Sequence, residues 1–163
     1  MNISIVRDVK TPVRGTEKSA GIDFFVPNDF SEAVLAPRHD ILIPSGVVAN
    51  VPENRMLMAA EKSGVVTSKQ AVELAGRTPK PSAFTSVVIL GAKIVDEDYQ
   101  GEIHIHLINV GDEPVIIRPG AKIAQFILVP VDYADINVVP RDQLFSKKSE
   151  RGEGGFGLGT GEE

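Results

Sequence analysis

The sequence predicts an all-β fold, an antiparallel sandwich, barrel or jelly roll with one minor helix. Short segments rich in β-branched and aromatic residues are separated by 15 glycines and 11 prolines, which mark turns. The 163 residues suit a single domain and are enough to bury a hydrophobic core. We find no internal repeat, so the strands are expected to form one unit.

Eight segments are candidate strands. In the clearest of them Ile103, Ile105 and Leu107 alternate with polar residues, which is the period of a half-buried strand. The candidates are 3–6, 22–26, 41–51, 56–60, 87–90, 103–110, 115–117 and 122–131. A short helix is expected at 68–75, because Ser68 can cap its start and Gly76 can end it.

Charge and cysteine content narrow the classes of function. The chain has 22 acidic and 17 basic residues and a net charge of −5, which argues against direct nucleic-acid or anionic-membrane binding but leaves room for a small phosphorylated ligand. The absence of cysteine removes disulfides, thiolate nucleophiles and zinc fingers. We find neither a signal peptide nor a membrane-spanning run. A soluble cytoplasmic protein is expected, or one in the nucleoid or host cytoplasm if it is viral.

The C-terminal stretch permits two interpretations. Six of the ten residues at 152–161 are glycine, so this segment is expected to be mobile in isolation. Its literal G-x-G-x-x-G lacks the strand and helix of a dinucleotide fingerprint. The tail is either a disordered end or a nucleotide clamp, in which Arg151 meets a phosphate and Phe156 stacks on a base.

The acidic segment 96–98 also leaves two interpretations open. Three acids beside Tyr99 and a glycine usually form a solvated hairpin tip. Alternatively, Asp96 follows the apolar Ile94 and Val95, so its carboxylate is semi-buried and within reach of a water, as a general base requires. Tyr99 would then offer a flat face to a sugar.

Three further clusters are weaker signals. Lys62-Ser63-Gly64 offers a cation, a hydroxyl and an amide, but a Walker A motif is absent. Gln125 interrupts an apolar strand, so it is satisfied by the backbone or points at a ligand. His104 and His106 share a strand face without a third ligand nearby, which favours a sheet or subunit-interface face over a metal site. Any metal should be a hard ion such as Mg²⁺, held mainly by substrate phosphates.

In this order, the pieces resemble the trimeric deoxyuridine triphosphatase (dUTPase) family over about residues 3–161. The matching stretches are Ala20-Gly21-Ile22-Asp23, Lys62-Ser63-Gly64, 95–101, 118–125 and Arg151-Gly152 with 155–157. The resemblance implies a jelly-roll-like barrel or sandwich subunit with a flexible glycine-rich C-terminal arm. It implies a β domain at 1–146, with an insertion at 65–85 that includes the expected helix, and a mobile arm at 147–163.

The resemblance also implies an activity. A homotrimer with active sites shared between subunits would hydrolyse dUTP to dUMP and pyrophosphate, with Mg²⁺ on the triphosphate. This reaction limits uracil incorporation into DNA and supplies dUMP for thymidylate synthesis. By position, Asp96 would activate the water that attacks the α-phosphorus, Tyr99 would pack under the deoxyribose, and Asp23 would support the phosphate–metal region indirectly.

The remaining implied residues contact the substrate. A hairpin from Leu90 and Gly91 to Val95 would read uracil through backbone groups. The groups expected to hold phosphates are Lys62, Ser63, the Gly64 amide and Gln125. In the arm, Arg151 and Thr160 would reach the γ-phosphate, while Phe156, next to Gly157, covers the uracil.

The chain departs from the family pattern at several positions, and two other functions compete. Lysine stands at position 62 where arginine is usual, Lys93 replaces a common glycine, and Leu158-Gly159-Thr160 replaces the usual Ser-Thr.

The related dCTP deaminase would need a glutamate where His106 stands. A non-enzymatic jelly-roll interaction module would have no need for the full set of motif residues, of which Asp96 is the clearest example.

Overall fold

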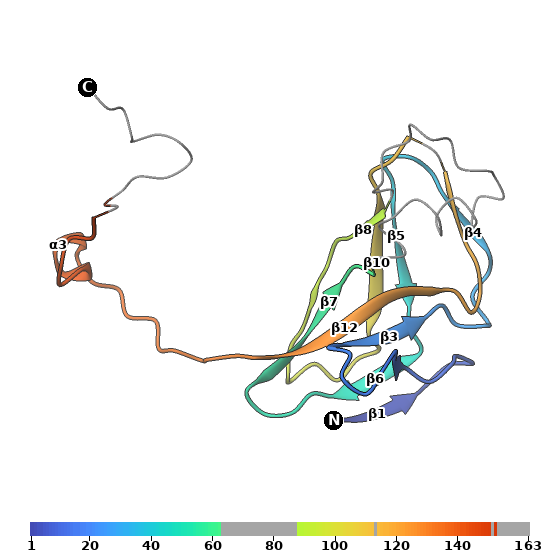
Figure 1. The fold of residues 1–163 in the computed structure, drawn as a ribbon, viewed down its shortest axis with the longest axis horizontal. Helices are drawn as coiled ribbons and strands as arrows, with labels where there is room; N and C mark the ends of the chain where they lie inside the picture. The colour runs from blue at the N-terminus through green and yellow to red at the C-terminus, as the bar shows by residue number, and fades with distance from the viewer. Residues whose placement is uncertain (63–87, 113, 151, 153–163) are drawn as a thin grey trace. The chain divides into compact units, whose positions relative to one another are not determined.

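The computed structural model describes residues 1–62, 88–112, 114–150 and 152 (Figure 1). It divides into two units, Met1–Asp132 and Tyr133–Glu163. The expected helix at 68–75 and the insertion at 65–85 lie outside the described residues, as does nearly all of the glycine-rich end. No helix in the described residues is long and apolar enough to cross a membrane. The boundary between a β domain at 1–146 and an arm at 147–163 remains a prediction.

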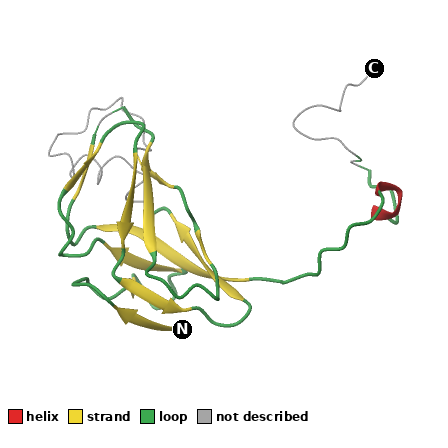
Figure 2. Ribbon diagram, turned by 180° about the vertical axis from the view of Figure 1, so that it is seen from behind, coloured by secondary structure: helices red, strands yellow, loops and turns green. Residues whose placement is uncertain are grey.

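The first unit consists of antiparallel strands, which confirms the all-β prediction (Figures 1 and 2). Its largest described sheet has the order β2 (Val13–Arg14), β3 (Gly21–Phe25), β12 (Lys122–Pro130), β7 (Arg55–Ala60) and β9 (Ile94–Val95). A second sheet has the order β5 (Asp40–Pro44), β10 (His104–Asn109) and β8 (Val88–Leu90). Two separate two-stranded sheets complete the described part of this unit. They are β1 (Asn2–Ile5) with β6 (Val47–Asn50) and β4 (Ala33–Leu35) with β11 (Val115–Ile117).

One hydrophobic core joins these sheets. Ile105 and Leu107 of β10 are buried, as the alternation in this segment predicts. They belong to the same buried cluster as Phe24 of β3 and Phe126 of β12, whose ring centroids are 4.5 Å apart. The β10 sheet and the five-stranded sheet therefore pack through their apolar faces.

The described strands follow the predicted ones within one or two residues at β1, β3, β7, β8 and β10 to β12. The run at 41–51 splits into β5 and β6 at Ser45 and Gly46, because Gly46 adopts a φ of 72° in the predicted turn. Strands β2, β4 and β9 were not predicted, because two or three residues show no period; β8 and β11 are equally short but were predicted from their runs of branched aliphatic residues. The second unit contains an unpredicted four-residue helix, α3 (Arg141–Leu144).

Candidate active site

Three of the motifs converge in the five-stranded sheet. Because β12 lies between β3 and β7, Gln125 is opposite Asp23 on one side and opposite Ala60 on the other. Lys62 follows two residues after Ala60. The first, second and fourth motifs, distant in sequence, therefore form one polar cluster at neighbouring sheet positions.

Asp23 is the centre of this cluster and is only 4% exposed. Its Oδ1 accepts a hydrogen bond from Lys62 Nζ, and its Oδ2 accepts one from Lys122 Nζ at 2.9 Å. Burial disfavours the charged carboxylate, but the two lysine hydrogen bonds outweigh burial and hold the pKa of Asp23 below its ordinary value. Two ammonium groups share one carboxylate, so the cluster keeps a positive charge that suits a phosphate.

The same geometry bears on Mg²⁺. Each oxygen of Asp23 accepts one lysine hydrogen bond, so a metal ion bound directly to this carboxylate would lie beside two ammonium groups, which repel it. In the described part of the chain no group of three or more histidine, aspartate and glutamate side chains could hold a metal. The residues present therefore fit an ion carried by the phosphates of a ligand, with Asp23 acting through the two lysines.

The Asp23 cluster predicts a specific acid sensitivity. Because the folded-state pKa of Asp23 lies below its unfolded value of 3.8, its contribution to stability is complete above that pH and is lost as the pH falls through the folded-state pKa. Asp23→Asn should cost about 2 kcal/mol at pH 7 and make stability less dependent on pH below about 4. Urea unfolding at pH 7 and 3.5 measures both effects, and an unchanged pH dependence in the variant would contradict the assignment.

Gln125 is held by both of its neighbouring strands. Its Nε2 donates to the Glu61 carbonyl at 3.0 Å, so the backbone satisfies one end of the amide, one of the two alternatives for this residue. A Cβ placed on Gly21 would lie 2.0 Å from Gln125 Oε1. Gly21 is therefore required by close packing against the amide, and its position in the first motif is explained by a residue of the fourth.

Gly21→Ala is expected to displace the Gln125 side chain, since the added methyl overlaps the amide. The variant should lose about 1–3 kcal/mol of stability and weaken binding of a phosphorylated ligand several-fold. Thermal unfolding and ligand titration measure the two effects. Gly15→Ala is the matched control, because its added Cβ meets only Ser19 Oγ at an ordinary 3.5 Å. Equal behaviour of the two variants would show that the Gly21–Gln125 packing is unimportant.

The third motif borders a separate hollow of about 190 Å³. Residues 92–96 and Tyr99 form one side of it, and Leu42, Ile103, His104 and Phe126 complete the lining. The hydroxyl of Tyr99 donates to the Glu102 carbonyl at 2.9 Å, which fixes the ring, and the side chain is 44% exposed. The predicted flat face is thus present and accessible beside the candidate base.

Asp96 itself is exposed, so the expectation of a semi-buried carboxylate is wrong for this chain. The reason is its position. It follows β9, a two-residue strand at the edge of the five-stranded sheet, and the 96–98 turn opens to solvent. In the single chain Asp96 lies on a solvated turn. Its carboxylate is nevertheless open to water, as a general base requires.

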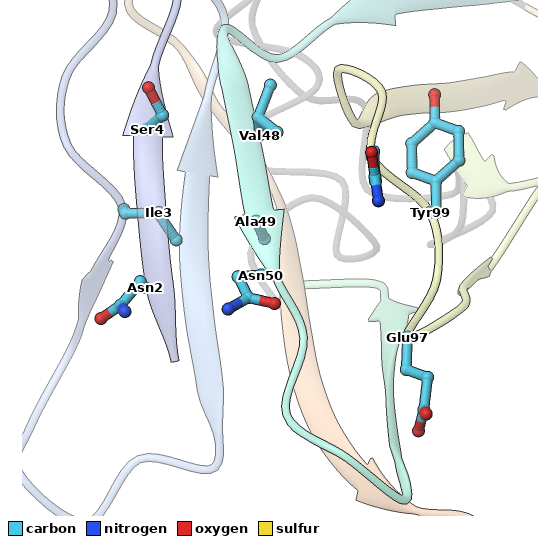
Figure 3. Close-up of a pocket in the computed structure, with 9 residues that line it drawn as sticks. Asn2, Ile3, Ser4, Val48, Ala49, Asn50, Glu97 and Tyr99 are labelled. Atoms are coloured by element: carbon cyan, nitrogen blue, oxygen red, sulfur yellow. The ribbon is translucent and has the colours of Figure 1, made fainter.

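A larger hollow of about 410 Å³ lies on the other side of Tyr99. Figure 3 shows Asn2, Ile3 and Ser4 of β1 and residues 48–50 of β6 facing the loop that carries Glu97 and Tyr99. This hollow is larger, but Asp96 does not line it. We assign the candidate site to the smaller hollow, because Asp96, the candidate base, lines it together with Tyr99 and residues 92–95.

The described chain does not bring Asp96 to the Asp23 cluster. β9 and β3 are separated by β7 and β12, which at three spacings of about 4.8 Å puts them roughly 14 Å apart. Val95 pairs with Leu57, whereas Gln125 pairs with Ala60 further along β7. Asp96 and Asp23 therefore lie toward opposite edges of the five-stranded sheet in one chain.

Sequence reasoning missed two site residues, Glu61 beside the segment that lines the hollow and Lys122 in the Asp23 cluster. Glu61 Oε1 accepts hydrogen bonds from the Leu90 amide at 3.2 Å and from Lys93 Nζ at 2.8 Å. Burial opposes its charge, but the bond from Lys93 and backbone bonds keep the pKa of Glu61 below its ordinary value. Lys122 was included in the fourth motif without a role. Glu61 directly follows the apolar strand β7, and Lys122 begins the apolar strand β12. A charged residue at the end of an apolar strand was the sequence signal that could have marked both as site residues.

His104 and His106 do not form a metal site among the described residues. His104 Nδ1 lies 2.9 Å from the Glu102 carbonyl, and His106 contacts Asp40 and the 91–92 backbone. Both histidines contact residues of the sheet and its loops, and the prediction of a sheet or subunit-interface face remains a prediction. The substrate residues expected outside the described part of the chain are Ser63, Gly64, Arg151, Phe156, Gly157 and Thr160.

Fold and site together define an all-β protein with a buried carboxylate that binds two lysines and a hollow lined by an acidic residue. Comparison with known proteins identifies the class. The dUTPase family profile matches residues 7–160. A deoxyuridine 5'-triphosphate nucleotidohydrolase of Hydrogenobaculum sp. (strain Y04AAS1) is 32% identical over 150 residues, 92% of this chain and 90% of that protein. The chain belongs to the dUTPase family.

Solved structures agree on the fold. The Staphylococcus bacteriophage 80alpha dUTPase with dUPNHPP is similar with a TM-score of 0.73 at 22% identity, over 96% of this chain and 95% of that one. A mutant dUTPase from phage phi11 of S. aureus, described with a structural Mg(II) ion, is similar with a TM-score of 0.65 at 19% identity, over 85% and 95%. These similarities confirm the jelly-roll-like fold.

Proposed function

We propose that this chain is a dUTP diphosphatase, which hydrolyses dUTP to dUMP and pyrophosphate in the cytoplasm. The observation that carries the proposal is family membership across residues 7–160, with an acid and an aromatic residue at the third motif. The reaction limits uracil incorporation into DNA and supplies dUMP for thymidylate synthesis.

The residues have distinct roles in this reaction. Asp96 takes a proton from the water that attacks the α-phosphorus, and its exposure gives that water access. Tyr99 packs under the deoxyribose, with its ring fixed by the Glu102 carbonyl. The backbone of 90–95, with Leu90, Gly91 and Val95, reads the uracil. These three contacts orient the nucleotide before the attack.

Phosphates bind at the Asp23 cluster. Lys62 and Lys122 supply positive charge, Gln125 adds an amide, and Ser63 and the Gly64 amide extend the same site. Asp23 holds both lysines in place. Mg²⁺ bound to the triphosphate would neutralise part of its charge, and the donor set described above suits an ion held by phosphate oxygens rather than by Asp23 directly.

We propose that a complete site is built from more than one copy of the chain. The distance of roughly 14 Å between β9 and β3 supports a homotrimer in which one subunit supplies Asp96 and Tyr99 and a second supplies the Asp23 cluster. The arm at 147–163 comes from a further subunit, with Arg151 and Thr160 at the γ-phosphate and Phe156 and Gly157 over the base. Closure of the arm excludes water and aligns the attack.

The test is pyrophosphate release from dUTP, dCTP, dTTP and UTP, each with and without Mg²⁺. We expect turnover of dUTP alone, increased by Mg²⁺. Ammonia release from dCTP would favour a deaminase instead. Absence of turnover with all four nucleotides would contradict the proposal and favour a binding module that has kept the fold without the chemistry.

A further inference from the structure

The segment that walls the 190 Å³ hollow has little regular support. Residues 91–93 connect β8 to the two-residue strand β9, and two backbone bonds tie them to the sheets. Gly91 N–H donates to the His106 carbonyl at 2.9 Å, and Ala59 N–H donates to the Lys93 carbonyl at 2.6 Å. Residues 92–96 nevertheless form one side of the hollow. Side chains also contact this wall and add to its few backbone bonds.

His106 is such a group. Its Nδ1 lies 3.1 Å from the Ala92 amide nitrogen, and its Nε2 lies 2.8 Å from Asp40 Oδ2. A backbone N–H can only donate, so Nδ1 must be an unprotonated acceptor. Nε2 then carries the proton and donates it to Asp40. The carboxylate thus selects the tautomer that allows the imidazole to bind the segment.

Packing makes the contact close. A Cβ on Gly91 would lie 2.2 Å from His106 Nδ1, so the segment lies directly against the ring and leaves no space for a side chain at this position. His106 does not itself line the hollow. It supports the wall from behind, and Glu61 provides a second attachment through Leu90 and Lys93.

We infer that Asp40 and His106 form a positioning pair that sets the base-facing wall of the hollow and thereby the selectivity of the site among pyrimidine nucleotides. The inference rests on the proposed function, because it assumes that this wall meets the base. The pair touches no substrate. Its effect is on binding of the base rather than on the attack at phosphorus, so it should change KM far more than kcat.

The variants separate this role from a general loss of structure. His106→Leu removes the acceptor for Ala92, and we expect KM for dUTP to rise roughly 5- to 50-fold with kcat changed less than about 3-fold. The preference for dUTP over dCTP should fall. His106→Asn can present its amide oxygen near the former Nδ1, so it should recover most of the wild-type KM.

Two further variants serve as partner and control. Asp40→Ala removes an exposed carboxylate that fixes the tautomer and should raise KM about 3-fold without loss of the fold. His39→Leu is the matched control, because the His39 ring bonds the Pro37 carbonyl, at 2.9 Å, rather than the wall of the hollow, and KM should stay unchanged. If His106→Leu does not fold, the Asp40→Ala result decides.

A spectroscopic measurement tests the geometry without turnover. Long-range ¹H–¹⁵N correlation of the wild-type chain near pH 7.5 should show His106 protonated at Nε2 and not at Nδ1. A proton on Nδ1, or an unchanged KM in both His106→Leu and Asp40→Ala, would overturn the inference. If the wild-type chain does not hydrolyse dUTP, the proposed function fails and this inference fails with it. Normal wild-type turnover with an unchanged KM in those variants overturns this inference alone.

Discussion

Asp96→Asn should lower kcat for dUTP by roughly 10²- to 10⁴-fold, the usual effect of removing a general base. Asparagine keeps the shape of the side chain but cannot accept the proton of the attacking water. The carboxylate is exposed at the end of an edge strand, so the substitution should not affect folding or assembly. Nucleotide binding should also remain close to normal.

Steady-state kinetics and nucleotide titration measure the two quantities. Asp98→Asn is the matched control, because Asp98 lies exposed on the same turn and lines neither hollow. We expect it to retain wild-type kcat. Near-normal turnover in Asp96→Asn would show that another group accepts the proton.

Truncation after Glu150 should leave a folded, assembled protein and lower kcat/KM for dUTP by on the order of 100-fold or more. The deletion removes Arg151, Phe156, Gly157 and Thr160, which are proposed to align the triphosphate and exclude water. The described strands and the buried core all precede this point, so stability should not change.

Removal of 161–163 alone is the control for the truncation, because it retains every arm residue with a proposed role. Circular dichroism and size-exclusion chromatography establish folding and assembly before kinetics are compared. Full activity after truncation at Glu150 would refute the clamp and show that the glycine-rich end is dispensable.

Strands were predictable where the pattern was long enough. β10 shows three complete alternations, and its inward residues Ile105 and Leu107 are buried as expected. β9 has two residues and no period, yet its pairing with β7 determines where Asp96 points. The exposure of Asp96 followed from this edge position, which composition and spacing could not reveal.

The chemistry of the site was predictable in kind but not in arrangement. Asp23, Lys62 and Gln125 were all expected in the phosphate region, and the sheet order places them together. That Asp23 binds two lysines depends on Lys122, which is 99 residues away in sequence. The bonds from His106 to Asp40 and from Glu61 to Leu90 likewise join distant positions, for which a single sequence offers no local signal.

The division of the site between subunits is the central proposal, which the resemblance to the family implies and the separation of β9 from β3 supports. It can be tested by mixing Asp96→Asn with a variant of the Asp23 cluster, Gln125→Leu, after joint unfolding and refolding, once each variant alone is shown to have little turnover. Each variant retains the half-site that the other lacks. Suppose that each site combines Asp96 of one chain with the cluster of another. In random trimers from an equal mixture, each of these two half-sites is unmutated in about half of the cases, so about a quarter of the sites are intact.

Pyrophosphate release from dUTP by the refolded mixture is therefore the decisive measurement. The account predicts recovery to about a quarter of the activity of wild-type protein refolded in the same way. Each variant refolded alone should remain near background. A mixture no more active than its components would show that every complete site lies within one chain, and would contradict the account.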